Sequence, residues 1–271
     1  MSYLRHLRKI ANILQAAEAM GAISSVSSVE ILKRYLNDPN RSIRETCEIA
    51  LAKIEWDHSL EGQAHHSAPA RKDRCVLCVC HSLPLTRSDR AYISIDPAPP
   101  TSGLLKGKPT PEDLSQDSIE SLRVSLTDSA LPLFERYRAM FALRNIGTDA
   151  AVDALASGFA DDSALFKLVS HNHNHPFYPL TKKPLSRHEI AFVFGQLLSP
   201  HSAPALVEVL RNTKESDMVR HEAAEALGGI GTPEVLPHLR EWMVRDDSPR
   251  VVRESCQVAI DMWEVRHLSE S

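Results

Sequence analysis

Apolar residues recur three and four positions apart through much of this chain, which is the spacing of one face of an amphipathic helix. The segments with this spacing end at glycine, proline or short polar turns, so each predicts a helix that stops there. Consecutive segments pair as helix, turn and helix. The clearest cover residues 135–147, 148–163, 187–200, 201–213 and 220–231. The pattern predicts an all-α fold.

One stretch of the sequence occurs twice. Residues Ala16–Trp56 and Ala223–Glu264 align with a small length difference in the middle. Within them, AAEAMGAI matches AAEALGGI, and SIRETCEIALAKIEW matches VVRESCQVAIDMWE. The repeat length is about 30–35 residues, in the range of short HEAT-type repeats. Stacked helix pairs bury a core that no single pair could bury. We therefore expect a HEAT-like α-solenoid of antiparallel helix pairs.

Two stretches interrupt the helical pattern. Residues 57–115 are rich in Pro, Ser, His and charged side chains and have no sustained helical spacing. We interpret them as an irregular linker between a first arm, residues 1–56, and a second arm, residues 116–271. Residues 170–186 are the second interruption. They lie where the flanking repeats lead us to expect only a short turn.

Composition excludes several classes of protein. Hydrophobic residues make up 43% and charged residues 24%, and the net charge of −4 gives no basic excess for nucleic acid. The sequence contains no run of about 18 apolar residues, so it predicts no membrane-spanning helix. The five cysteines, an odd number, and the absence of a secretory signal pattern indicate reduced thiols. We expect a cytoplasmic protein, with a nuclear location or a mitochondrial address left open as alternatives.

Two His-Glu dipeptides occupy the same place in successive repeats. His188–Glu189 and His221–Glu222 each follow an arginine near the start of a first helix, one repeat apart. Stacking should therefore place them side by side. Imidazole nitrogens and carboxylate oxygens suit iron or manganese, and no cysteine lies beside them for structural zinc. One such pair alone usually reflects the preference of Glu for a helix N-terminus. Two pairs in register predict a metal site.

Other candidate sites are weaker. The His-Glu pairs do not form HExxH, because Phe192 and Glu225 stand where its second histidine would be, so a zinc protease is excluded. Two further groups could bind metal but are more simply read as solvated loop. They are a CxxCxCH cluster at Cys75, Cys78, Cys80 and His81, and a tract at His171, His173 and His175.

Several segments of the chain are distinctive. They are the paired RHE helices, RYRAMFALRNIG, SIDPAPP, MVRHEAAEALG and VVRESCQVAIDMWE. Together they resemble the deoxyhypusine hydroxylase family, and the resemblance, which covers Ala16–Glu264 apart from the two interruptions, is most specific in the second arm. It implies two homologous HEAT-repeat arms and a non-haem di-iron monooxygenase. Such an enzyme would use Fe²⁺ and O₂ to hydroxylate the deoxyhypusine side chain of a translation factor, completing hypusine.

The resemblance also implies site residues. In that family each arm supplies two His-Glu pairs, and both irons take ligands from both arms. His188, Glu189, His221 and Glu222 match the pairs of the second arm one for one. Met218 matches a position implied to help orient the substrate chain. No catalytic residue beyond the metal ligands is implied.

The first arm departs from this pattern. Because Ala16 aligns with Ala223, Leu14 and Gln15 stand where His221 and Glu222 stand in the second copy. Leucine has no donor atom and glutamine is a poor ligand. The other pair of this arm would precede the first residue of the chain. We therefore expect a truncated first arm, half of the ligands and an inactive chain. A homodimer of two second arms would rebuild the full set, but the sequence gives no support for it.

Two glutamates of the first copy fall beside the empty ligand positions. Glu18 and Glu45 match Glu225 and Glu254, which are not ligands in the second copy. We interpret both as residues of the helix surface or as supports around a site rather than as metal ligands.

A gene-model hypothesis accounts for both anomalies. Val169–Ser170 can be encoded by GTAAGT and Leu180–Thr181 can contain CTAAC, which resemble a splice donor and a branch point. Residues 1–15 can likewise end on a splice acceptor. Residues 1–15 and about 169–186 would then be translated intron. Mature transcripts that contain both stretches would exclude this. The alternative is a lineage-specific insertion and a genuine start at Met1.

Two other functions compete with the hydroxylase. A non-catalytic HEAT-repeat scaffold would bind a protein partner through its concave face. It predicts no bound iron and no effect of changing His188 or His221. A bilin-lyase-type HEAT protein would have to bind a tetrapyrrole, and it leaves the register of the His-Glu pairs unexplained.

Overall fold

The computed structural model consists of helices, short 3₁₀ turns and the loops between them. It describes residues 2–67, 96–101, 109–160 and 184–268, and these ranges contain no strand. The chain divides into two compact units. The first comprises Met1–Lys108 and Ala130–Phe141, and the second comprises Pro109–Ser129 and Ala142–Ser271.

In the first unit, α3 packs against two earlier helices. These elements are α1 (Ser2–Ile23), α2 (Val29–Tyr35) and α3 (Arg41–Asp57). Asn40 begins α3, because its side-chain oxygen accepts a hydrogen bond from the backbone N–H of Ile43 at 3.3 Å. Their shared core consists of Ala17, Leu32, Ile43, Cys47, Ala50 and Ile54. The amphipathic spacing of the first repeat copy is thereby buried as predicted.

A short helix occupies part of the segment predicted as an irregular linker, residues 57–115. Helix α4 (Leu60–Ser67) follows a turn in which the Ser59 hydroxyl donates to the carbonyl of Trp56 at 2.6 Å. Glu61 on this helix pairs with Arg138 of α6 (Leu133–Ile146) at 2.9 Å. The polar composition of α4 hides its helical spacing. The boundaries of the two arms and the linker stay a prediction.

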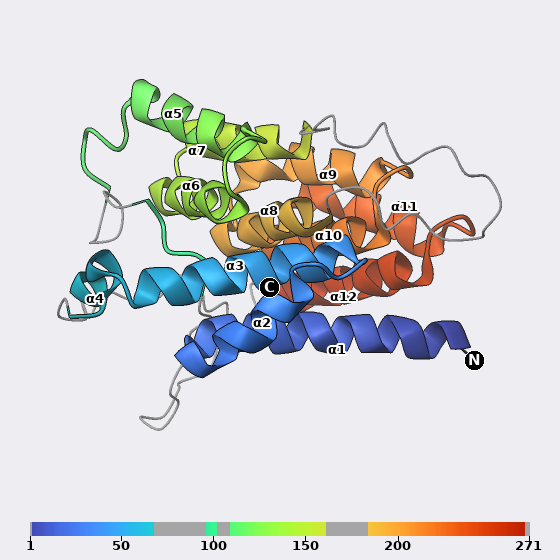
Figure 1. Cartoon of the computed structure of the whole chain (residues 1–271). Helices are drawn as coiled ribbons and strands as arrows, with labels where there is room; N and C mark the ends of the chain where they lie inside the picture. Colours follow the sequence, from blue (N-terminus) through green and yellow to red (C-terminus); the bar gives the residue numbers. More distant parts are fainter. Residues whose placement is uncertain (1, 68–95, 102–108, 161–183, 269–271) are drawn as a thin grey trace, which may run out of the picture. The chain divides into compact units, whose positions relative to one another are not determined.

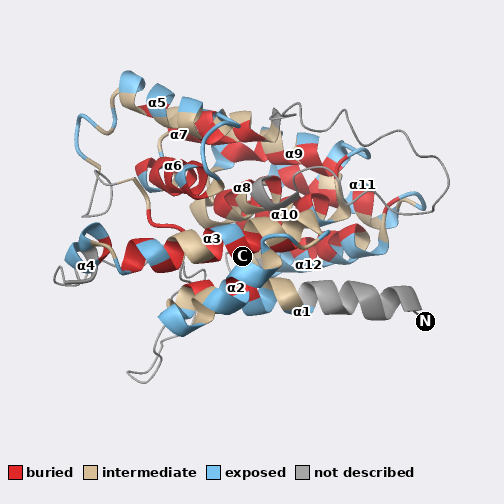
Figure 2. Ribbon diagram, viewed as in Figure 1, coloured by how far each residue is buried: buried red, intermediate tan, exposed pale blue. Residues whose placement is uncertain are grey.

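In the second unit, α10 (Asp217–Ile230) packs against three helices (Figure 1). Its neighbours are α8 (Pro184–Leu197), α9 (Ala203–Arg211) and α12 (Arg250–Leu268). Helix α11 (Leu236–Val244) packs on α12, and α5 (Gln116–Thr127) packs on α7 (Asp149–Ala156). Buried residues lie on the facing sides of these helices (Figure 2). Successive helix–turn–helix pairs therefore stack as the repeat pattern predicts.

Small residues let α10 approach its neighbours closely. A Cβ at Gly228 would lie 2.6 Å from the Cα of Ala259 on α12, so only glycine fits there. Gly195 on α8 faces Ala226 of α10 with more room, at 3.5 Å. Gly231 ends α10 with a φ of 66°, a backbone conformation that suits glycine. The α8–α10–α12 spacing is thus set by side-chain size.

The two copies of the repeat also share a turn contact. Arg44 donates to the carbonyl of Pro39 at 3.1 Å, and Arg253 donates to the carbonyl of Ser248, which aligns with Pro39, at 2.8 Å. Each arginine ties the helix it belongs to back to the turn before it. The alignment made from the sequence therefore holds at the level of individual hydrogen bonds.

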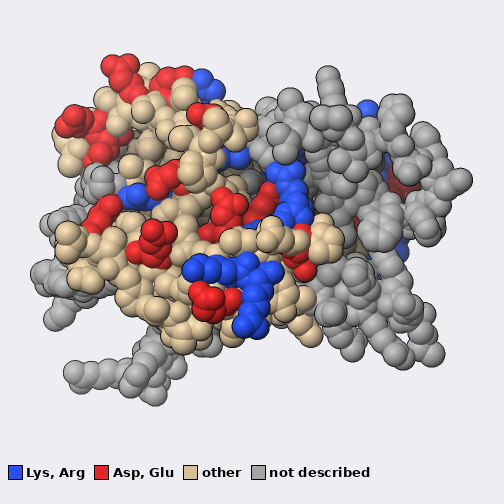
Figure 3. Space-filling model, in the orientation of Figure 1, with Lys and Arg blue, Asp and Glu red and all other residues tan. Residues whose placement is uncertain are grey.

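Charges are mixed on the described surface. Acidic and basic side chains are interspersed among neutral ones on the face drawn in Figure 3, in keeping with the small net charge of −4. Within the described ranges, the helices are too short or too polar to span a lipid bilayer.

Candidate metal centre

The His-Glu pairs stand at the same height on neighbouring helices. His188 lies one turn into α8 and His221 lies one turn into α10. Ser216 is the N-cap of α10: its hydroxyl oxygen accepts a hydrogen bond from the backbone N–H of Val219 at 3.3 Å. Because α8 and α10 pack together, the predicted juxtaposition of the two pairs is realised.

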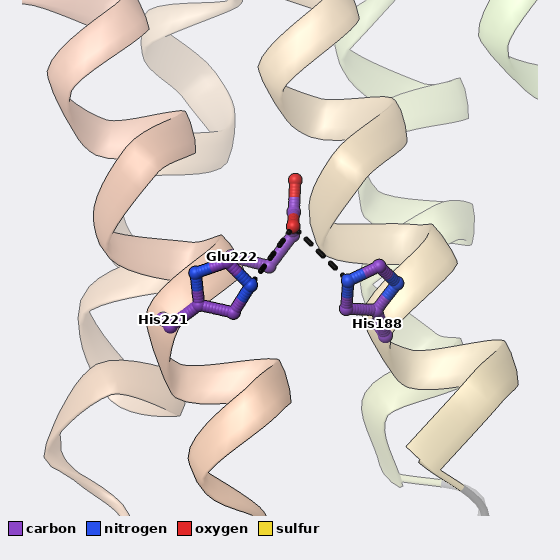
Figure 4. A group of neighbouring side chains, drawn as sticks. All are labelled: His188, His221 and Glu222. Atoms are coloured by element: carbon purple, nitrogen blue, oxygen red, sulfur yellow. Dashed lines mark ion pairs between the residues drawn. The ribbon is translucent and has the colours of Figure 1, made fainter. Parts of the chain in front are cut away.

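Three of the four predicted ligand residues converge. Oε2 of Glu222 lies 3.1 Å from Nε2 of His188 and 3.5 Å from Nε2 of His221. Figure 4 shows the three side chains pointing toward one another from the two helices. One donor atom from each residue lies within 4.8 Å of the other two. The side chains are 27%, 17% and 13% exposed for His188, His221 and Glu222, so all three are partly accessible to solvent.

The remaining predicted site residues lie close by but outside this cluster. Among the described side chains, Glu189 is half-buried on α8, and its carboxylate is not one of the three converging groups. Met218 lies one turn before His221 on α10 and is 52% exposed. The cysteine cluster at residues 75–81 and the histidine tract at residues 171–175 lie outside the described residues.

A buried ion pair, which the sequence analysis missed, joins the starts of the two helices. Arg187, next to His188, pairs with Glu215, and both side chains are less than a tenth exposed. The other carboxylate oxygen of Glu215 accepts a hydrogen bond from the backbone N–H of Ser216 at 2.8 Å. Glu215 thus holds α8 against the first turn of α10 and helps keep the two histidines in register. The sequence analysis missed Glu215 because it lies in a loop, where the spacing of apolar residues gives no indication of a residue's role.

Arg220, next to His221, is anchored differently. It is 2% exposed, its Nε donates to the carbonyl of Leu210 at 2.9 Å, and its guanidinium lies 4.5 Å from the centre of the Trp242 ring. Burial lowers the pKa of Arg220 from its ordinary value. The two arginines that precede the histidines are therefore structural.

The donor set fits a divalent metal ion. Ligand atoms bound at about 2.0–2.2 Å lie at most about 4.4 Å apart, so the three donors need only small shifts to share one ion. Two imidazoles and one carboxylate form a set typical of non-haem Fe²⁺. The half-buried carboxylate would offset part of the charge of the ion.

Comparisons with known proteins agree with this architecture. HEAT repeats match residues 181–261, and the PBS lyase HEAT-like repeat matches residues 135–161. The chain in the structure of human deoxyhypusine hydroxylase in complex with glycerol is 37% identical in sequence to this one, and the two structures superpose with a TM-score of 0.64. That match covers 93% of this chain and 67% of the human one. The predicted fold class, an all-α HEAT-like solenoid, is confirmed.

Curated relatives give the same match at the level of sequence. The deoxyhypusine hydroxylase of Lentinula edodes is 62% identical over 225 residues, which is 83% of this chain and 58% of that protein. The deoxyhypusine hydroxylase of Mus musculus is 39% identical over 86% of this chain and 59% of its own length. The chain thus spans less than two thirds of these relatives.

Proposed function

Because this chain belongs to the deoxyhypusine hydroxylase family, we propose that its second unit supplies one half of a hydroxylase site. The substrate is the deoxyhypusine side chain of a translation factor, and the product is hypusine. The observation that carries this proposal is the convergence of His188, His221 and Glu222 from two stacked repeats. That arrangement serves no packing purpose, since core residues need neither imidazole nor carboxylate there.

The three converging residues would hold an iron ion. His188 and His221 offer Nε2, and the carboxylate of Glu222 lies between them. When bound, iron supplies the activation of O₂ that places one oxygen atom on the substrate. Glu189 is the fourth ligand that the resemblance implies. In the first unit, Leu14 and Gln15 supply no equivalent pair, so a complete centre needs ligands from another source.

The surroundings of the cluster suit a cationic side chain. Deoxyhypusine is a lysine-derived chain with protonated amines, and carboxylates at the site attract such a group. Met218, exposed one turn from His221, would contact the methylene groups of that chain. Arg187, beside His188, is paired with Glu215, so its positive charge is largely offset within the fold.

A chimera tests the proposal independently of the first arm. Residues 116–271 of this chain would replace the second arm of the Lentinula edodes relative. Mass spectrometry would follow the gain of one oxygen atom on a deoxyhypusine-bearing translation factor. We expect hydroxylation by the chimera and none when it also carries His188→Ala and His221→Ala. A helical, soluble chimera that fails while the intact relative is active would refute the proposal.

The same experiment addresses the scaffold alternative. A scaffold that binds a protein partner needs neither histidine, so its partner binding would survive the double substitution. Retained binding of the translation factor by the double variant, together with an inactive parent chimera, would favour the scaffold.

A further inference from the structure

The second ring nitrogen of His221 faces two polar groups. Nδ1 lies 3.1 Å from the hydroxyl of Ser255 and 3.3 Å from Oε1 of Glu225. The Ser255 hydroxyl in turn donates to that same Oε1 at 3.2 Å. Ser255 is 5% exposed and comes from α12, whereas Glu225 lies one turn after His221 on α10. His221 is therefore held by two helices.

The chemistry of these groups selects one tautomer of His221. A carboxylate only accepts hydrogen bonds, so the single hydroxyl proton of Ser255 is directed to Glu225. The hydroxyl oxygen is then left to accept from Nδ1–H. The opposite tautomer would place the Nδ1 lone pair against the negative oxygen of Glu225. On the other side of the ring, Oε2 of Glu222 is farther from Nε2, at 3.5 Å, and is nearer to Nε2 of His188, at 3.1 Å, so the closer partners at Nδ1 decide where the proton lies. With the proton on Nδ1, the lone pair of Nε2 is directed to the side of His188 and Glu222.

The first unit offers an internal comparison. Thr46 and Glu18 stand at the repeat positions of Ser255 and Glu225, while Leu14 stands at the position of His221. Thr46 is 4% exposed, and its hydroxyl oxygen is a buried atom with no hydrogen-bond partner. A buried hydroxyl without a hydrogen-bond partner lowers the stability of the folded state by about 1–3 kcal/mol. The same helix position thus has a bonded hydroxyl where the histidine is present and an unpartnered one where it is absent.

We propose that Ser255 and Glu225 are positioning residues that fix His221 as its Nδ1–H tautomer and present Nε2 as a ligand atom. The inference rests on the proposed function only for the identity of the metal. Hydrogen-bond partners of this kind orient a ligating imidazole, and their loss typically weakens metal binding about 10–100-fold. The group of three converging donors, His188, His221 and Glu222, includes neither residue.

Two readouts on the whole chain test this inference. Long-range ¹H–¹⁵N NMR of the metal-free protein reports the tautomer of His221. The signals of this ring are assigned as those that disappear in the His221→Asn variant. Titration with Co²⁺ alone reports affinity. We expect the Nδ1–H tautomer in the parent chain. Ser255→Ala should give mixed tautomers and about 10–100-fold weaker Co²⁺ binding, and Ser255→Thr should restore both.

Two further variants sharpen the test. In Glu225→Ala the hydroxyl of Ser255 is freed to donate to Nδ1, so the Nε2–H tautomer should increase. Thr46→Val is the matched control: it removes the equivalent hydroxyl where no histidine stands, and should leave tautomer and Co²⁺ affinity unchanged. Thermal unfolding of each variant separates these effects from loss of the fold.

The outcomes distinguish this inference from the proposed function. A dominant Nε2–H tautomer in the parent chain, or unchanged tautomer and affinity in Ser255→Ala, would overturn the positioning role. A parent chain that binds no Co²⁺ yet shows the Nδ1–H tautomer, lost in Ser255→Ala, would support the positioning role and count against the metal centre.

Discussion

Nε2 of His188 and Oε2 of Glu222 meet at 3.1 Å across two stacked repeats. The same carboxylate oxygen lies 3.5 Å from Nε2 of His221, so Glu222 links both histidines. Glu189, its counterpart in the preceding repeat, does not join the described group of three. Of two residues that look equivalent in the sequence, Glu222 therefore belongs to the converging group and Glu189 does not.

This difference predicts unequal effects of removing the two carboxylates. Glu222→Gln should weaken Co²⁺ binding by more than about tenfold, because it removes the charged donor nearest both imidazoles. Glu189→Gln should weaken Co²⁺ binding by less than about threefold, because its carboxylate is not one of the three converging groups. Isothermal titration of the two variants measures the contrast. Equal losses would show that both carboxylates bind the ion directly.

The N-terminal cap of α10 should matter for both stability and metal binding. Ser216→Ala removes the hydroxyl that caps this helix and should lower the free energy of unfolding by about 1 kcal/mol. Fraying of this turn should also weaken Co²⁺ affinity. Ser115→Ala is the matched control, since Ser115 caps α5 at 3.2 Å from the N–H of Ser118. It should cost similar stability and leave affinity unchanged; reduced affinity in both would mean a global effect.

The close approach of α10 and α12 predicts a large effect of one methyl group. Gly228→Ala places a Cβ 2.6 Å from Ala259, which should cost about 1–3 kcal/mol by overpacking. Gly195→Ala meets Ala226 at an ordinary 3.5 Å, so its better helix propensity should be neutral or stabilising by up to about 1 kcal/mol. Urea unfolding followed by circular dichroism compares them. Similar values for the two would contradict the packing described.

Two buried thiols predict a pH dependence. Burial raises the pKa of Cys256 from 9.0 to about 12 and that of Cys47 to about 11. The folded state keeps both protons above pH 9, whereas the unfolded state loses them. Their contribution to stability is thus full below about pH 9 and is lost as the pH rises toward their folded values.

Alkylation measures this directly. At about pH 10, both cysteines should resist iodoacetamide in the native chain and react after unfolding in urea, as read by peptide mass spectrometry. Rapid native labelling of Cys256 at a pH where the protein stays folded would contradict its burial.

The sequence alone predicts the helices of the repeats, the internal repeat itself and the register of His188 with His221, because each depends on spacing along the chain; it misses α4, whose composition is polar. It does not predict contacts that depend on the third dimension. Glu215 sits in a loop, and the role of Ser255 becomes visible only once α12 is placed against α10. The sequence likewise does not show which of the two glutamates joins the converging group. The cellular location stays a prediction.

Fe²⁺ binding by the untagged chain, measured under anaerobic conditions, tests the central claim most directly. The comparison needs the His188→Ala/His221→Ala variant and, as a control, His201→Ala/His238→Ala. The control histidines contact Asp153 and Arg211, away from the cluster. We predict that the parent and the control bind iron and that the first variant does not. Equal binding by all three, or binding by none, would contradict a metal centre built on His188, His221 and Glu222.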